Sequence, residues 1–457
     1  MLPGAMLGIA AGGFAFGTLP VNAIRLLLGL IAVTFALNRW FAISERIARH
    51  LSANERVPGT AAGVFWGTLS GFTSTLAHAG GPLLVRSNGT PYVWSTASAI
   101  SYRTDNGPLS ATVDEAQARS RVQAMFTVWQ NVGSSNISYD RGGVINSTAG
   151  FNDGDVSTGA EYNAVEGDCN NAVQSPIVYD ADGAIFTDLG IDVTSILGFA
   201  GPCAIDASNY LSGQAVMNGL FIDGQAAPVP DIPPEAFDTV FVHEFGHFSG
   251  LDHSQINVNC QFPCGADDLA GLPTMFPLLV SATQGQLSVD DIAWISRLYP
   301  QTGAGGFTST HGTISGTVYF SDGESHAQLV NVIARQVDTG LNQDRTTAGS
   351  VVSGYRFRVF HGNPINDPGG AGPGGSAPAL IGLYEIPVPP GNYTVEVESI
   401  DPGFTEGSSV GGPILIPMPG AAPAAIGPIS VTAGSTTSGH DIVLIGTSPR
   451  FDQFEGP

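Results

Sequence analysis

The sequence predicts three structural parts: two to three N-terminal transmembrane helices, an α+β domain with a twisted sheet and long helices, and a C-terminal all-β sandwich. Residues 1–79 are almost continuously apolar, with five Arg and two acidic residues. After them, strand-like patterns flank a long helical pattern, and the last third alternates as strands do. We therefore place the membrane segment at residues 1–80 and the α+β domain at residues 81–300. A linker follows at residues 301–312, the β domain at residues 313–447 and a tail at residues 448–457.

The composition is strongly acidic. The 457 residues include 39 Asp and Glu against 16 basic residues, all of them Arg, for a net charge of −23. Proteins that bind nucleic acid need basic surface to displace counterions, so we expect no nucleic-acid partner. The 60 Gly and 31 Pro favour turns and β-rich structure over long helical bundles.

The apolar N-terminal part contains three stretches that could cross a membrane: Pro3–Thr18, Val21–Phe41 and Val57–Ala79. An Arg-bearing loop lies between the second and third stretches, and such loops tend to stay cytoplasmic. Everything after residue 80 would then lie outside the cytoplasm. A cleavable signal peptide is the alternative, but it would need a single apolar run after a basic start.

Two stretches of this part, Pro20–Leu30 and Gly67–Pro82, resemble the TauE/SafE family of anion exporters. The resemblance implies membrane helices, although family members have many more of them than this chain offers. A complete transport path is therefore not expected. A gene fusion, an exporter remnant joined to a secreted domain, and a misjoined reading frame all stay open.

The middle domain begins with a strand pattern and a helix. Thr112 and Glu115 have the spacing of a capping box, which predicts a helix start there. Five apolar residues then recur at helical spacing and predict a buried face: Val122, Met125, Phe126, Trp129 and Val132. Strands are expected on either side, at Tyr92–Tyr102, Asn136–Asp140 and Gly213–Ile222.

The most informative motif is HEFGHFSGLDH. His243 and His247 are four residues apart, so on a helix both rings project from one face and can hold one metal ion. Glu244 lies beside them and could reach a water on that metal. Gly250 can end the helix in the left-handed conformation, which lets His253 supply a third nitrogen.

Three neutral imidazoles leave a fourth tetrahedral position for water, which is typical of catalytic zinc. Zinc lowers the pKa of that water, and Glu244 could take its proton as it attacks a peptide carbonyl. The sequence therefore predicts a zinc-dependent endopeptidase. The alternative is a non-catalytic protein that binds metal and serves adhesion.

The motif HExxHxxGxxH is similar to the zinc signature of the metzincin family, and Ser254 after His253 resembles its matrixin branch. Leu272–Pro277 resembles the Met-turn beneath the metal, with Met275 in that role, and Ser288–Tyr299 resembles the closing helix, with Ser288 as its N-cap. This resemblance covers residues 83–300. It implies a metzincin-like metalloendopeptidase that cleaves extracytoplasmic proteins or peptides, with Gly213–Ile222 as the sheet edge that receives the substrate.

Four cysteines allow two disulfides in an oxidising compartment. Cys260 and Cys264 could form a small disulfide loop, which we favour over metal binding because the histidines already complete a site. Cys169 and Cys203 would then be the second pair, although the sequence alone does not fix the pairing.

Three aspartates form a candidate calcium site, because matrixins commonly carry structural calcium: Asp180, Asp182 and Asp188. The alternative is an ordinary turn in which the carboxylates satisfy their own backbone.

The C-terminal region contains GTISGTVYFSDG and YEIPVPPGNYTVEVE, which resemble the carboxypeptidase regulatory-like β-sandwich. It has no catalytic constellation, so we expect a spacer or an adhesive module. Taken together, the sequence predicts an extracytoplasmic zinc endopeptidase, anchored in a membrane by its N-terminal helices or secreted if that segment is lost.

Overall fold

The computed structural model describes residues 84–147 except 87, 151–254 except 152, and 256, 266–357, 378–398 and 424–446. The chain divides into two compact units, and all of these residues belong to the second, Ala77–Phe454. The predicted membrane segment and the tail lie outside the described residues. No helix among the residues described is long and apolar enough to cross a membrane.

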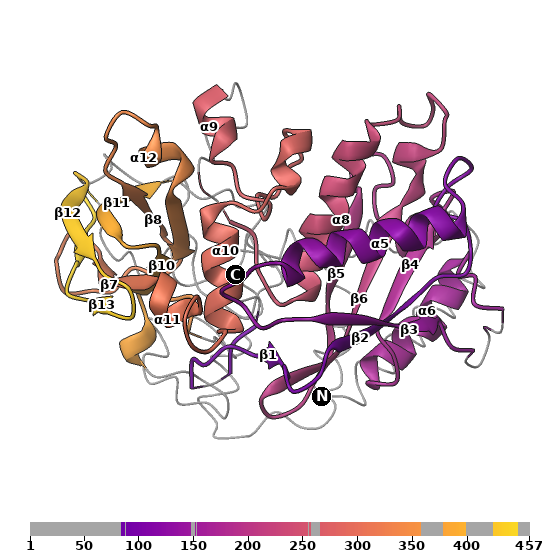
Figure 1. Ribbon diagram of the computed structural model, residues 1–457, viewed down its shortest axis with the longest axis horizontal. Helices are drawn as coiled ribbons and strands as arrows, with labels where there is room; N and C mark the ends of the chain where they lie inside the picture. Colours follow the sequence, from indigo (N-terminus) through magenta and orange to yellow (C-terminus); the bar gives the residue numbers. More distant parts are fainter. Residues whose placement is uncertain are drawn as a thin grey trace, which may run out of the picture. The chain divides into compact units, whose positions relative to one another are not determined.

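A six-stranded sheet forms the first half of this unit (Figure 1). Five strands run parallel in the order β1-β6-β4-β2-β3: β1 (Val93–Trp94), β6 (Asn209–Asn218), β4 (Pro176–Asp180), β2 (Ile100–Thr104) and β3 (Tyr139–Val144). The sixth strand, β5 (Gly198–Ile205), pairs with β6 in the antiparallel direction. Helix α5 (Glu115–Gln130) connects β2 to β3, and α6 (Gly159–Asn170) connects β3 to β4.

The predicted α+β fold class was wrong, because these connections make the protein α/β with mixed sheets. A strand that follows a crossover helix returns in the same direction, so neighbouring strands become parallel. The alternation of apolar residues reveals where strands lie but not which way they run. The helices that separate the strands were the signal for a parallel sheet.

Helices cover both faces of this sheet. Along β4, Ile177 and Tyr179 belong to the same apolar core as residues of α5 and of α8 (Pro234–Phe248). Val178, between them, belongs to a second core with residues of α6 and α7 (Ala184–Leu189). Successive side chains of a strand point to opposite faces, so each face of the sheet has its own core.

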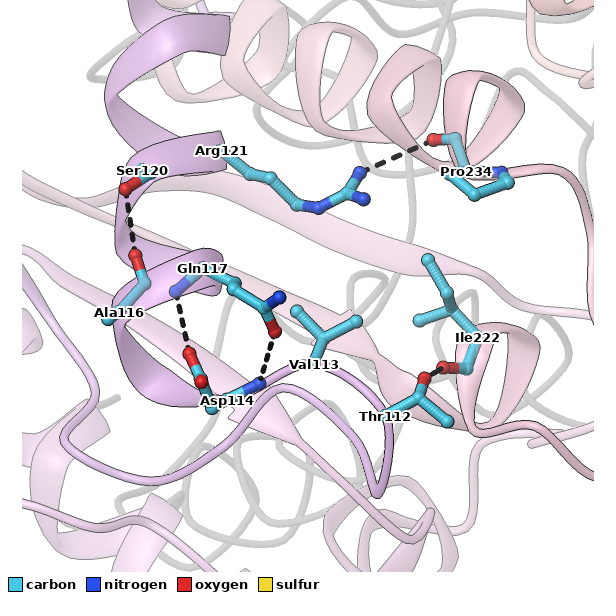
Figure 2. Close-up of a pocket in the computed structure, with 9 residues that line it drawn as sticks. All are labelled: Thr112, Val113, Asp114, Ala116, Gln117, Ser120, Arg121, Ile222 and Pro234. Carbon is cyan, nitrogen blue, oxygen red and sulfur yellow. Dashed lines mark hydrogen bonds between the residues drawn. The ribbon is translucent and has the colours of Figure 1, made fainter.

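The start of α5 differs from the predicted one. Asp114, not Thr112, is the N-cap: its carboxylate accepts from the Gln117 amide at 2.9 Å, and Gln117 Oε1 accepts from the Asp114 amide at 3.0 Å (Figure 2). The Thr112 hydroxyl instead donates to the carbonyl of Ile222 at 2.6 Å. The predicted apolar face is confirmed as core, with four of its five residues buried: Val122, Phe126, Trp129 and Val132.

Short helices follow α8 and lead to the C-terminal strands: α9 (Ala266–Ala270), η3 (Ala282–Gly285), α10 (Val289–Leu298) and α11 (Phe307–Thr310), with η1 (Gly219–Ile222) earlier in the chain. The predicted linker, residues 301–312, therefore contains one helical turn. Ser288 caps α10 as predicted, in a capping box with Asp291.

The C-terminal sheets, residues 312–443, are two sheets of four strands each. One joins β10 (Leu383–Val388), β7 (Gly312–Tyr319), β13 (Thr436–Thr437) and β14 (Ile442–Val443). The other joins β12 (Ile426–Val431), β11 (Gly391–Glu398), β8 (Asn331–Gln336) and β9 (Ala348–Val352), with α12 (Gln343–Thr346) and η4 (Pro378–Leu380) nearby in the chain. The region was predicted as all-β, but it includes these short helices, and the first sheet is mixed because β13 and β14 lie parallel to β7.

Candidate metal centre

Helix α8 carries two of the three predicted metal ligands, His243 and His247. It begins with Pro234 at its first position, where no amide donor is needed. Its apolar side packs on α5: the rings of Phe245 and Phe126 stack at 3.7 Å. This packing fixes the helix rotation, and the four-residue spacing then places both histidines on one face.

Gly250 ends α8 and reverses the chain. Its φ of +88° is left-handed. Its amide donates to the His247 carbonyl at 2.9 Å, and the Leu251 amide donates to the Gly246 carbonyl at 3.0 Å. These two bonds form a Schellman motif, which satisfies the last carbonyls of the helix. The chain then brings His253 back toward α8.

The three histidines converge through their Nε2 atoms. Nε2 of His253 lies 3.0 Å from that of His243 and 3.0 Å from that of His247, and the remaining separation is 3.2 Å. His247 and His253 are 3% and 5% exposed, whereas His243 is half-buried, so the cluster lies just below the surface. The structure thus brings together all three predicted ligands.

Hydrogen bonds at the Nδ1 atoms fix which nitrogen of each ring carries the proton. Nδ1 of His243 lies 2.7 Å from the Thr274 carbonyl, and Nδ1 of His247 lies 2.9 Å from the Leu251 carbonyl. A carbonyl only accepts, so each Nδ1 carries the proton. Burial lowers the pKa of His243 to about 4 and that of His247 to about 3, so both rings are neutral near pH 7. Their Nε2 lone pairs therefore face one another.

This arrangement fits a metal ion. Nitrogens bound at about 2.0–2.1 Å to a tetrahedral zinc ion stand about 3.3 Å apart, close to the separations observed. The lone pairs that would repel one another become ligands when a cation lies between them. Across the described residues, this is the one group of three or more His, Cys, Asp or Glu side chains gathered closely enough to hold a metal.

Glu244, the predicted proton carrier, is buried beside the histidines. Its side chain is 5% exposed, and its Oε2 has no hydrogen-bond partner among the described residues. Burial raises the pKa of this carboxyl to about 8. A buried carboxyl oxygen without a partner is costly for folding, which is typical of a residue kept for function.

Met275 lies directly behind α8. A Cβ on Gly246 would collide with Met275 Sδ, so the sulfur fills the space that this glycine leaves. The turn is held from α10, since one carboxylate oxygen of Asp291 accepts from the Thr274 amide at 2.8 Å and the other from the Met275 amide at 3.1 Å. The Thr274 carbonyl in turn fixes the ring of His243.

Sequence reasoning missed Asp291 and its neighbour Asp290. Both are buried to 2% exposure. Asp290 accepts from the hydroxyl of Ser254, the residue after His253. The sequence did contain a signal for them. Two adjacent acids lie in the first turn of a helix whose other residues are largely apolar, and carboxylates buried in such a helix need hydrogen-bond partners.

The stretch predicted to form a sheet edge, Gly213–Ile222, does not lie at an edge. Gly213–Ile222 overlaps β6 and η1, and β6 lies between β4 and β5. The edge that runs past the metal centre is β5, where a Cβ on Gly198 would be 3.1 Å from Glu244 Cγ. The sequence of β5 contains Gly and Pro, which suit an edge strand better than an interior one.

The candidate calcium ligands are not gathered around one point. Asp180 accepts from the amides of Ile185 and Phe186, at 3.2 and 2.8 Å. Asp182 accepts from the amide of Ala184. Asp188 accepts from a different segment, at Gly159. These carboxylates cap backbone amides, which matches the turn alternative.

One predicted disulfide is present. Cys169 in α6 is bonded to Cys203 in β5. The other predicted pair, Cys260 and Cys264, lies outside the described residues. The observed bond ties the edge strand beside the metal centre to a helix on the opposite face of the sheet.

No protein-family model matches this chain, and no curated protein matches it either. The functional assignment therefore depends on the residues gathered around the histidine cluster and on their chemistry.

Proposed function

We propose that this chain is a zinc-dependent endopeptidase of the matrixin-like type, which hydrolyses proteins or peptides outside the cytoplasm. One observation carries the proposal: three histidine Nε2 atoms converge next to Glu244, whose buried Oε2 has no hydrogen-bond partner among the described residues. The disulfide between Cys169 and Cys203 supports an oxidising compartment.

His243, His247 and His253 would hold the zinc. When bound, zinc supplies a Lewis acid that lowers the pKa of a coordinated water. Glu244 Oε2 then holds the proton released during attack on the peptide carbonyl and delivers it to the nitrogen of the leaving amine. Without a metal ion, burial raises the pKa of Glu244 to about 8. A zinc ion beside the carboxyl would lower that pKa again and favour the carboxylate that accepts the proton.

Strand β5 is the proposed platform for the substrate. Among the described strands it pairs only with β6, so its other edge is open to an extended peptide. Gly198 packs against the Glu244 side chain, which leaves the strand backbone close to the reacting groups. A peptide added to β5 would place its backbone beside the metal centre.

A protein that only bound metal would need the three imidazoles but not Glu244. Burying a carboxyl without a hydrogen-bond partner costs free energy. Retention of this group at the metal centre is expected when it moves protons, which favours the enzyme over the adhesion alternative.

The test compares two isosteric variants of the full chain, Glu244→Gln and Glu166→Gln. Glu166 is the matched control because it is also a helical glutamate whose pKa is raised by burial, but it lies in α6. We expect casein cleavage that a chelator abolishes and zinc restores. Glu244→Gln should keep its zinc and lose about 10²–10⁴-fold in kcat/KM, whereas Glu166→Gln should retain activity.

Stoichiometric zinc without any cleavage would instead support the metal-binding alternative. Undiminished cleavage by Glu244→Gln would show that another group moves the proton.

A further inference from the structure

We propose that Ser350, a residue of the C-terminal sheets, is a positioning residue for His253. The C-terminal sheets would then form part of the support of the metal centre, beyond the predicted role of spacer or adhesive module. This inference rests on the proposed metal centre but not on peptide hydrolysis.

His253 needs such support because it is the one ligand outside α8. The next residue, Ser254, is held at three points. Its amide donates to the Met275 carbonyl at 2.8 Å. Its hydroxyl donates to Asp290 Oδ2 at 2.6 Å and lies 3.0 Å from the hydroxyl of Ser350. The position of His253 therefore depends on what fixes Ser254.

Ser350, in β9, fixes Asp290 from the other side. Its amide donates to Asp290 Oδ1 at 2.8 Å. Its own carbonyl accepts from the indole Nε1 of Trp294, on α10, at 2.9 Å. One strand residue thus engages Asp290, Ser254 and α10 at once.

This network lies in the interior. Ser254 and Asp290 are 2% exposed, Trp294 is 3% exposed and Ser350 is 1% exposed. Water does not readily replace a lost hydrogen-bond partner in the interior. Removing one polar group of the network therefore leaves the group that bonded to it unsatisfied. The contacts therefore constrain Ser254 more strongly than the same contacts on a surface would.

An apolar contact fixes the chain on the far side of Ser254. Ile256 is fully buried and packs with Ile333 of β8 and Ala348 of β9. The polar and apolar contacts are independent of each other, yet both come from the same C-terminal sheet. Residues that orient the metal ligands, without binding the metal themselves, change the metal affinity of a site. Ser350 should therefore affect zinc binding although it does not contact the zinc.

The experiment uses the full chain with Ser350→Ala and a matched control, Ser353→Ala. Ser353 directly follows β9, is fully buried, and donates through its hydroxyl to the Ala327 carbonyl at 2.6 Å. Both variants remove one buried hydroxyl from the same region. In competition with a chelator, Ser350→Ala should bind zinc about three- to tenfold more weakly than the unmodified chain, whereas Ser353→Ala should stay within about twofold.

A second readout uses the zinc-free chain. We expect the Ser254 amide to exchange its hydrogen faster in Ser350→Ala than in the unmodified chain, and at an unchanged rate in Ser353→Ala. Ser350→Ala keeps the backbone contacts with Asp290 and Trp294 and removes only the hydroxyl. Equal zinc affinity and equal exchange in both variants would therefore overturn the positioning role of the Ser350 hydroxyl. If the unmodified chain bound no zinc, the proposed function would fail, and the exchange result alone would decide whether Ser350 holds this segment.

Discussion

Gly250→Ala tests whether the reversal after α8 builds the metal centre. An alanine in the left-handed conformation costs about 1–2 kcal/mol. The new Cβ would also lie 2.6 Å from Cε2 of the buried Tyr210, and such overpacking costs about 1–3 kcal/mol. The less flexible unfolded chain offsets about 0.4–1 kcal/mol. We therefore expect the free energy of unfolding to fall by about 1–5 kcal/mol, with about 3 kcal/mol at the centre of that range.

Gly190→Ala is the matched control, because Gly190 follows α7 with a φ of +73° and no heavy atom within 4 Å of an added Cβ. It should lose only about 1 kcal/mol, the conformational part of the cost. The assay is urea unfolding of both full-chain variants, together with their zinc affinity. Gly250→Ala should also bind zinc more weakly, since His253 lies three residues on. Equal stability losses and equal zinc affinities would refute this reasoning.

Three further predictions concern charge and cross-linking. Burial raises the pKa of Asp290 to about 7, so the folded chain keeps a proton that the unfolded chain releases. Stability should therefore fall by up to about 4 kcal/mol as pH rises from about 4 to 7, and Asp290→Asn should remove its share of that decline in urea titrations at several pH values. Replacing Cys169 and Cys203 together by Ser should cost about 2–4 kcal/mol in unfolding free energy, and an unchanged urea midpoint would contradict this. Burial lowers the pKa of His243 and His247, so protonation of these two rings should not weaken zinc binding between pH 8 and about pH 5; titration of either ring near pH 6.5 in an NMR experiment on the zinc-free chain would indicate an exposed ring.

The helix that carries His243 and His247 was predictable because its signals are local. Pro234 at the start, the four-residue spacing of His243 and His247, and the glycine at the end all lie within one short segment. Capping is a weaker signal. Thr112 and Asp114 both precede plausible helix starts, and the contact of Thr112 with the distant Ile222 decided between them.

The fold class had a signal in the helices that separate the strands, but the sheet edge and the outer support of the site had no comparable local signal. Strand direction and the position of β5 at the sheet edge depend on pairings between segments far apart in sequence. The contacts of Asp290 show the same limit, since its partners are Ser254, 36 residues before it, and Ser350, 60 residues after it. Periodicity marks such residues as buried but does not identify what they meet.

The histidine cluster is held in place by packing and hydrogen bonds, so the chain should stay folded without a metal ion. In zinc fingers, ion binding drives folding, so a chelator unfolds them. Here α8 is held by the core it shares with α5, and the histidine rings are oriented by the carbonyls of Thr274 and Leu251. Ion binding therefore does not need to order much of the chain. A chelator should therefore leave the near-ultraviolet circular dichroism of the chain unchanged, and the chain should bind added ion without refolding.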